Sequence, residues 1–157
     1  KADATQIHQI VMNLTTNAYH AMAETGGDLK VSLEEIQIDT LDIMDPDMEP
    51  GTYACLSVAD TGIGMDKELL GKIFDPFFTT KHLSQEHEGT GLGLAIAHQI
   101  IQEHRGSIEV QSVRGGGTTF LVNLHKPIML GTNRSGTHNR NTPSMCPQYM
   151  LVNHLIN

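Results

Sequence analysis

The sequence contains no tryptophan, only two cysteines and few aromatic residues, which make up 4% of its 157 residues. It also has no apolar run near the roughly 18 residues that a membrane-spanning helix requires. Cys55 and Cys146 lack the spacing of a zinc or redox motif, and residues 1–4 do not resemble a signal peptide. We therefore expect a cytoplasmic protein without a disulfide framework, while a longer parent protein with a membrane anchor stays open.

Basic side chains are also scarce, since 10 lysines and arginines stand against 18 aspartates and glutamates, and the net charge is −8. A protein that binds duplex DNA needs a stripe of basic side chains to replace the counterions of the phosphate backbone. The composition therefore argues against a nucleic-acid partner, although one polyphosphate can still bind locally. With 39% apolar residues, the chain can form one domain with a sizeable core.

The strongest local pattern is a glycine-rich stretch over residues 88–96, where three glycines alternate just before a helix predicted over 92–104. Glycine permits positive φ and close approach of a ligand to the backbone, while the free N–H groups of a helix's first turn favour an anion. The pattern therefore predicts a phosphate cradle, although a plain tight turn before a helix has the same signature. The predicted cradle residues are Gly89, Thr90, Gly91, Leu92 and Gly93.

The first predicted helix covers residues 4–23, where apolar side chains follow helical spacing and Asp3 opens a capping box. Asn13, Asn17 and His20 lie at i, i+4 and i+7, so they share one stripe about a quarter-turn from the apolar face. Such a stripe is either an ordinary solvated face or the wall of a site. Because asparagine is a mediocre helix former, two of them one turn apart favour a functional explanation.

Two strands are predicted after this helix. The first covers residues 29–38, where the apolar alternation changes phase between Leu33 and Ile36, as a bulged strand requires. Residues 53–59 form a mostly apolar strand suited to the middle of a sheet, and Asp60 follows at its end. An acid at a strand end before flexible glycines is either part of a turn or a carboxylate that reads a base.

A short helix is predicted from its Asp66 cap to Phe74. Phe74, Phe77 and Phe78 lie close together, and they form either a small satellite core or the hinge of a mobile lid over residues 79–88. After the next helix, two alternating segments flank three glycines and predict a β-hairpin. The element order predicts a two-layer α/β sandwich, with helices on one face of a mixed, mostly antiparallel sheet.

Five segments, taken in order, resemble the N, G1, F, G2 and G3 boxes of sensor histidine kinases. Each box is a weak signal alone, but their joint occurrence at suitable spacings over residues 3–127 is highly specific. The resemblance implies the Bergerat ATP-binding fold, which is shared with gyrase, the heat-shock chaperone ATPases and the mismatch-repair ATPases. The matching segments are Asn13-Leu14-Thr15-Thr16-Asn17-Ala18, Asp60-Thr61-Gly62-Ile63-Gly64, Phe74-Asp75-Pro76-Phe77-Phe78, Gly89-Thr90-Gly91-Leu92-Gly93-Leu94 and Gly115-Gly116-Gly117-Thr118-Thr119-Phe120.

For the base, the resemblance implies that Asp60 accepts a hydrogen bond from the amino group of adenine. Guanine would present an acceptor to the same carboxylate and leave a buried charge unpaired. Gly62 and Gly64 would let the backbone lie close to the adenine. Met65 would add a polarizable apolar contact, and Thr118 would support the adenine pocket beside Asp60.

For the phosphates, the resemblance implies that ATP lies on the glycine cradle and that the amide oxygen of Asn17 binds Mg²⁺, which prefers hard oxygen ligands. His20 and Lys81 lie where the family has side chains that contact phosphate, although a solvated histidine explains His20 equally well. The expected catalytic residues are Asn13 and Asn17.

Two other functions compete with a histidine kinase: a related ATPase that uses the nucleotide to change conformation, and a degenerate binding module. Asn13 occupies the position where hydrolysing relatives have a glutamate that activates water, and an amide cannot accept that proton. This difference argues against the ATPase. All five boxes are intact, which argues against the degenerate module.

Three departures from the family pattern concern the organisation of the protein. None of the nine histidines has the context of a phosphoacceptor, so we expect ATP to phosphorylate a histidine on a separate dimerisation domain, which then serves a response regulator. A strand that precedes the first helix in the family is expected to be missing, and the chain alone is expected to be monomeric. We assign residues 1–127 to the ATP-binding domain and expect 128–157 to be a disordered or artefactual tail.

Overall fold

A computed structural model describes residues 3–40, 48–80 and 90–126. Its elements are α1 (Ala4–Ala21), β1 (Leu29–Ile38), β2 (Gly51–Asp60), α2 (Lys67–Leu70), α3 (Gly93–Glu103), β3 (Ser107–Ser112) and β4 (Thr118–His125). Lys81, Gly89, Cys146, most of the predicted lid and the predicted tail lie outside the described residues.

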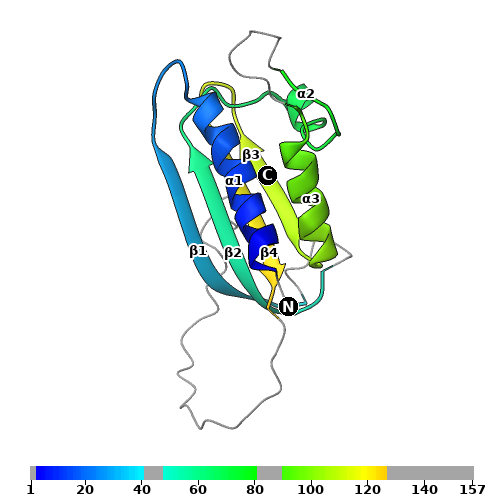
Figure 1. The fold of residues 1–157 in the computed structure, drawn as a ribbon. Coiled ribbons are helices and arrows are strands. Elements are labelled where there is room, and N and C mark those ends of the chain that lie inside the picture. The colour runs from blue at the N-terminus through cyan, green and yellow to red at the C-terminus, as the bar shows by residue number, and fades with distance from the viewer. Residues whose placement is uncertain (1–2, 41–47, 81–89, 127–157) are drawn as a thin grey trace, which may run out of the picture.

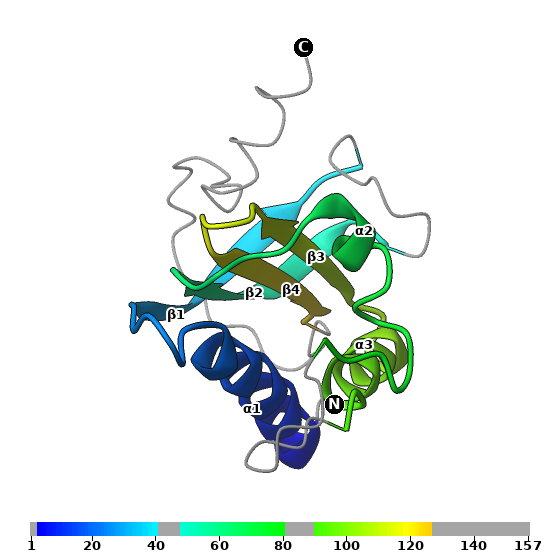
Figure 2. The ribbon, with the colours of Figure 1, turned by 90° about the horizontal axis from the view of Figure 1, so that it is seen from above.

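The four strands form one sheet in the order β1-β2-β4-β3, and each neighbouring pair is antiparallel. α1 and α3 lie side by side on one face of this sheet (Figure 1). Figure 2, turned by 90°, shows both helices on the same side. The predicted α/β sandwich with helices on one face is therefore confirmed, while the described residues contain no parallel pair of the kind that a mixed sheet implies.

α1 begins where the sequence predicts, because the Asp3 carboxylate accepts a hydrogen bond from Thr5 N at 2.9 Å. Its apolar stripe places Ile10, Leu14 and Ala18 in the core, where each side chain is at most 2% exposed. The helix ends two residues before the predicted boundary. Its buried stripe holds α1 against the sheet, so the polar stripe beside it has a defined position.

The main core fills the space between the two long helices and the sheet. Each large apolar side chain buried there contributes about 1.5–3 kcal/mol relative to an exposed one. Because this core joins α1 and α3 to the central strands, the residues at the adjacent ends of these elements are held in place. The core residues are Ile10, Leu14, Leu56, Val58, Ile73, Ala97, Ile100, Ile101, Phe120 and Val122.

The bulge predicted in β1 does not occur, because pairing with β2 continues without a break along all ten residues of β1. Leu29, Val31 and Leu33 lie on the helix face and remain 43%, 48% and 71% exposed. Ile36 and Ile38 are buried on the opposite face, in a second cluster with residues of β2 and β4. The two halves of one regular strand therefore place apolar side chains on opposite faces, which explains the change of phase without an extra residue.

α2 is shorter than predicted. Leu69 N donates to Asp66 Oδ1 at 2.9 Å, which confirms the cap, but the helix ends at Leu70 with Gly71 as its C-cap and does not reach Phe74. Glycine is a poor helix former and a common helix terminator, so this end has a local cause. Among the described residues, no helix is long and apolar enough to cross a membrane.

Candidate functional site

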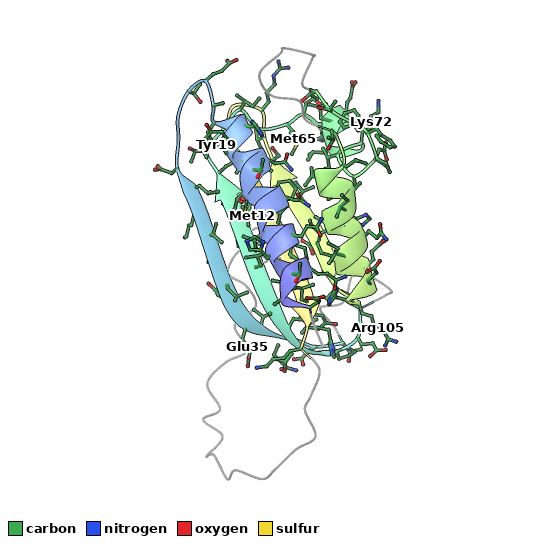
Figure 3. All side chains as sticks on the ribbon, in the orientation of Figure 1. Met12, Tyr19, Glu35, Met65, Lys72 and Arg105 are labelled. Atoms are coloured by element: carbon green, nitrogen blue, oxygen red, sulfur yellow. The ribbon has the colours of Figure 1, made fainter. Side chains whose placement is uncertain are left out.

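A cavity of about 650 Å³ lies between α1, the adjacent ends of β2 and β4, and the start of α3. Figure 3 labels two of its lining residues, Met12 on α1 and Met65 in the loop between β2 and α2. The lining mixes polar and apolar side chains. It comprises Met12, Asn13, Thr16, Asn17, Ala18, His20, Ala21, Glu24, Asp60, Ile63, Gly64, Met65, Leu69, Ile73, Phe78, Thr79, Thr80, Thr90, Gly91, Gly93, Leu94, Thr118 and Phe120.

Most of the site residues proposed from the sequence meet in this cavity. They are Asn13, Asn17, His20, Asp60, Gly64, Met65, Thr90, Gly91, Gly93 and Thr118. Gly62 and Leu92 are described but do not line the cavity, while Lys81 and Gly89 fall outside the described residues. The stripe on α1, the acid at the end of β2 and the glycine-rich turn before α3 therefore line one cavity, as a ligand that spans all three would require.

One end of the cavity is a polar wall formed by the sheet. The strand register places Asp60 opposite Thr118, and these side chains are only 8% and 5% exposed. Asp60 Oδ1 accepts a hydrogen bond from Gly62 N at 2.8 Å, which is the only hydrogen bond of this carboxylate within the described residues. A buried carboxylate oxygen that retains acceptor capacity favours a ligand with a hydrogen-bond donor at this end.

The glycines near this wall are required by protein packing. Gly64 has a φ of 61°, and a Cβ there would overlap the carbonyl oxygen of Val113. A Cβ on Gly117, whose φ is 84°, would overlap the carbonyl oxygen of Asp60. A Cβ on Gly62 would lie 2.6 Å from Ala21 O. These contacts give the glycines a role that the resemblance did not supply, because they let the loop after β2 pack against α1 and the β3–β4 turn.

The opposite end of the cavity is formed by the turn before α3. Gly91 has a φ of 65°, and its carbonyl oxygen accepts a hydrogen bond from Phe77 N at 3.0 Å. Leu92 occupies the N-cap position of α3 without a side-chain cap hydrogen bond. The first N–H groups of a helix have no partners within that helix, and they attract anions. This end therefore has the properties of an anion site.

The Asn13 side chain lies next to the start of α3, since a Cβ on Gly93 would lie 3.4 Å from Asn13 Oδ1. Its Nδ2 is buried and has no hydrogen-bond partner within the described residues. An unsatisfied buried donor costs about 1–3 kcal/mol, which an acceptor on a ligand would recover. A phosphate oxygen satisfies this requirement, so the residues present fit the phosphate chain of a nucleoside triphosphate at this end.

The described residues contain no group of three or more His, Cys, Asp or Glu side chains that could hold a metal ion. An ion at this site would therefore take few protein ligands, and the bound ligand and water would supply the rest. The amide of Asn17 offers an oxygen from the same cavity wall as Asn13. Mg²⁺ accepts few protein ligands beside phosphates and waters, so this donor set fits it.

The three phenylalanines do not form the satellite core proposed as one alternative. Phe74 packs against the main core and stacks on His98, with ring centroids 4.9 Å apart. Phe77 is 74% exposed and has a φ of 66°, whereas Phe78 lines the cavity. Neighbouring residues thus have three different environments, because the turn around Phe77 reverses the chain toward Gly91.

Sequence reasoning missed several apolar residues of the cavity, among them Ile63, Ile73, Phe78 and Phe120. Ile63, Phe78 and Phe120 lie within the matching segments, which could have indicated them, whereas nothing local distinguishes Ile73. Thr16 could have been found, because it lies three residues from Asn13 on the same stripe of α1.

The fold and the two ends of the cavity define a nucleotide-binding α/β domain, and comparison with known families makes the class more specific. The model of the histidine kinase-, DNA gyrase B- and HSP90-like ATPases matches residues 2–128. The chain therefore belongs to this ATPase family.

Two curated relatives of the chain are a sensor kinase and a signal transduction histidine-protein kinase. The sensor kinase CckA of Brucella abortus is 40% identical over 129 residues, which cover 82% of this chain and 13% of that protein. The signal transduction histidine-protein kinase AtoS of Escherichia coli is 38% identical over 123 residues, which cover 78% of this chain and 17% of that protein. The chain thus spans only a small part of the length of these relatives.

Solved structures agree with this assignment. The nucleotide-free catalytic domain of the histidine kinase ThkA is 33% identical, with a TM-score of 0.57 over 80% of this chain and 68% of that one. Full-length ShkA in complex with AMPPNP is 27% identical, with a TM-score of 0.53 over 76% of this chain and 21% of that one. The described fold is therefore that of histidine kinase catalytic domains.

Proposed function

We propose that this chain binds Mg-ATP and transfers its γ-phosphoryl group to a histidine on a separate dimerisation and phosphoacceptor domain. The observation that supports this most strongly is the pairing of two unlike ends in one cavity. Asp60 and Thr118 offer acceptors at one end, while Asn13 and the start of α3 offer donors at the other. A nucleotide with a base that donates hydrogen bonds and an anionic chain matches this polarity.

The end of the cavity formed by Asp60 and Thr118, the base end, selects the base. The carboxylate of Asp60 accepts from the exocyclic amino group, and the Thr118 side chain lies beside it in the same wall. Met65 and Ile63 contribute apolar contact from the loop after β2. Guanine would bring a carbonyl against Asp60, so GTP should bind more weakly than ATP.

The phosphate end positions the reacting group. Asn17 would hold Mg²⁺ through its amide oxygen, and a bound ion would supply charge neutralisation at the phosphate oxygens. Asn13 donates from Nδ2 to a phosphate oxygen, while the N–H groups at the start of α3 hold the rest of the chain. His20 lines the same cavity, and we assign it and Lys81 to further phosphate contacts.

The reaction needs a nucleophile from outside this chain. The imidazole nitrogen of the partner's histidine attacks the γ-phosphorus, the bond from that phosphorus to the β,γ-bridging oxygen breaks, and ADP leaves with the electron pair. The imidazole proton passes to solvent. Positioning and charge stabilisation are most of what phosphoryl transfer requires from a protein, and this cavity supplies both. The phosphohistidine would then serve a response regulator.

A conformational ATPase is the second candidate, since the family also includes gyrase-type and HSP90-type members. Hydrolysis requires a group that accepts a proton from water. The Asn13 amide cannot accept it. This difference favours transfer to a histidine over transfer to water.

The test is transfer of radiolabelled γ-phosphate to a separately purified dimerisation and phosphoacceptor domain from a related kinase, alongside release of free phosphate. The unmodified chain should form acid-labile phosphohistidine on that domain and release little phosphate. Asn13→Asp is the matched variant, because it keeps the size of the side chain and restores a proton acceptor. Rapid phosphate release by the unmodified chain, without phosphohistidine on any acceptor domain, would support the ATPase.

A further inference from the structure

Ser112 lies directly behind the base end of the cavity, although it does not line it. The strand register places Ser112 opposite Thr118, and Thr118 opposite Asp60. These polar side chains therefore form one row across β3, β4 and β2. Residues directly opposite each other in an antiparallel sheet share a face, so the whole row lies on the face covered by the helices.

The Ser112 hydroxyl joins three segments. Met65 N donates to Ser112 Oγ at 2.8 Å, from the loop that follows β2. Ser112 Oγ donates to Gly117 O at 2.9 Å, in the turn between β3 and β4. A third contact of 2.9 Å joins Ser112 Oγ to Thr118 Oγ1.

The number of hydrogens decides the direction of that third contact. A serine hydroxyl has one hydrogen and two lone pairs, and the carbonyl oxygen of Gly117 can only accept. The single hydrogen of Ser112 is therefore used by Gly117 O, and the lone pairs accept from Met65 N–H and from Thr118. All three contacts can be hydrogen bonds only when Thr118 donates its hydroxyl hydrogen to Ser112, away from the cavity.

Thr118 consequently presents only lone pairs to the ligand, as does the Asp60 carboxylate beside it. We propose that Ser112 is a positioning residue for base selection, which holds Thr118 as an acceptor so that the wall takes an amino group and rejects a carbonyl. This role rests on the proposed function, since it names the residue that sets the choice of base at the same site. Ser112 contacts neither base nor phosphate and acts through Thr118 and the Met65 backbone.

Removal of the hydroxyl would affect three groups, of which Gly117 O keeps the hydrogen bond that it accepts from Val113 N at 3.3 Å. In Ser112→Ala, the Thr118 hydrogen is free to turn into the cavity, where it can donate to the carbonyl of a 6-oxopurine. Met65 N–H also loses its acceptor, so the loop at the base end is held less firmly. A 6-oxopurine nucleotide would then be penalised less than it is by the unmodified chain.

The experiment compares ATP with inosine triphosphate, whose base has a carbonyl where adenine has its amino group. Calorimetry on the whole chain gives the Kd of each nucleotide, and amide hydrogen exchange without nucleotide gives the protection of Met65. Three variants are needed. Ser112→Ala removes the hydroxyl, Ser112→Thr keeps it, and Ser107→Ala removes a buried hydroxyl at the far end of the same strand, where it pairs with Asn123.

We expect Ser112→Ala to lower the preference for ATP about fivefold to tenfold, the size of one net hydrogen bond, and to speed exchange at Met65. Ser112→Thr should restore both values, and Ser107→Ala should change neither. A preference kept at the original level in Ser112→Ala, or unchanged exchange at Met65, would overturn the role of Ser112 alone. An unmodified chain that binds both nucleotides equally would overturn the base assignment of the proposed function and the role of Ser112 with it.

Discussion

The two ends of the cavity differ in how completely the protein satisfies them. At the base end, Asp60, Thr118 and Ser112 are aligned by strand register, and Gly64 and Gly117 pack against neighbouring backbone. At the phosphate end, Asn13 Nδ2 has no partner among the described residues, and α3 starts without a side-chain cap. The side chains at the base end are thus held in place before the ligand arrives, with acceptor capacity left on Asp60, while the phosphate end has a buried donor without a partner and an uncapped helix start. Selection between bases requires hydrogen-bonding groups that are fixed in place. Phosphate binding instead uses N–H donors that cost free energy when they have no hydrogen-bond partner.

The largest expected effect is at the phosphate end. Asn17→Ala removes the proposed metal ligand, so phosphoryl transfer should fall below detection, while the fold stays intact because Asn17 is only half-buried on the polar face of α1. Asn17→Asp keeps an oxygen donor and should retain measurable transfer. Transfer to a phosphoacceptor domain at several Mg²⁺ concentrations measures both. Normal transfer by Asn17→Ala would remove this residue from the site.

A substitution that disturbs the packing at the base end should lower the stability of the fold. Gly64→Ala combines a φ of 61° with an overlap on the Val113 carbonyl, so unfolding free energy should fall by about 3 kcal/mol or more. Gly115→Ala is the matched control, because its φ is 78° but nothing lies within 4 Å of the added Cβ. It should cost only about 1 kcal/mol. Denaturant unfolding compares the two, and equal losses would show that packing at Gly64 adds nothing to its φ.

Base recognition should give the next largest effect. Asp60→Ala removes the acceptor for the adenine amino group and should weaken ATP binding by about 2 kcal/mol. Asp66→Ala is a suitable control, since it removes the cap of α2 without lining the cavity. It should cost about 1 kcal/mol of stability and leave the affinity unchanged. Calorimetry with ATP and GTP decides this, and equal affinities for the two nucleotides in the unmodified chain would contradict the assignment of Asp60.

The smallest expected effect separates the two ends most clearly, because the stability of the ligand-free chain and its affinity for ATP should change in opposite directions. Asn13→Leu replaces a buried donor that has no partner with an apolar side chain of similar size. The ligand-free chain should gain about 1 kcal/mol of stability, while ATP binds more weakly. Thermal unfolding with and without ATP measures both. A variant that is less stable without ATP would show that Asn13 is already satisfied in the free protein.

Several features could be predicted because their causes are local. The Asp3 and Asp66 caps depend on backbone N–H groups two or three residues away, and the structure has both. The stripe of Asn13 and Asn17 follows from helical spacing alone. The predicted bulge in β1 was wrong because a change of phase also arises when the two halves of a regular strand place their apolar side chains on opposite faces.

Most of the polar residues and glycines that line the cavity could be named from the sequence, but their hydrogen-bond partners could not. Apolar periodicity, glycine positions and caps specify which segments become helices, strands and turns, since each depends on a few neighbouring residues. The proposed direction of the Thr118 hydroxyl depends on Ser112, which also accepts a hydrogen bond from Met65 N, 47 residues earlier in the chain. The partnerless amide of Asn13 likewise depends on where α3 begins relative to α1. These properties arise from contacts between distant segments, so they became visible only when packing had brought those segments together.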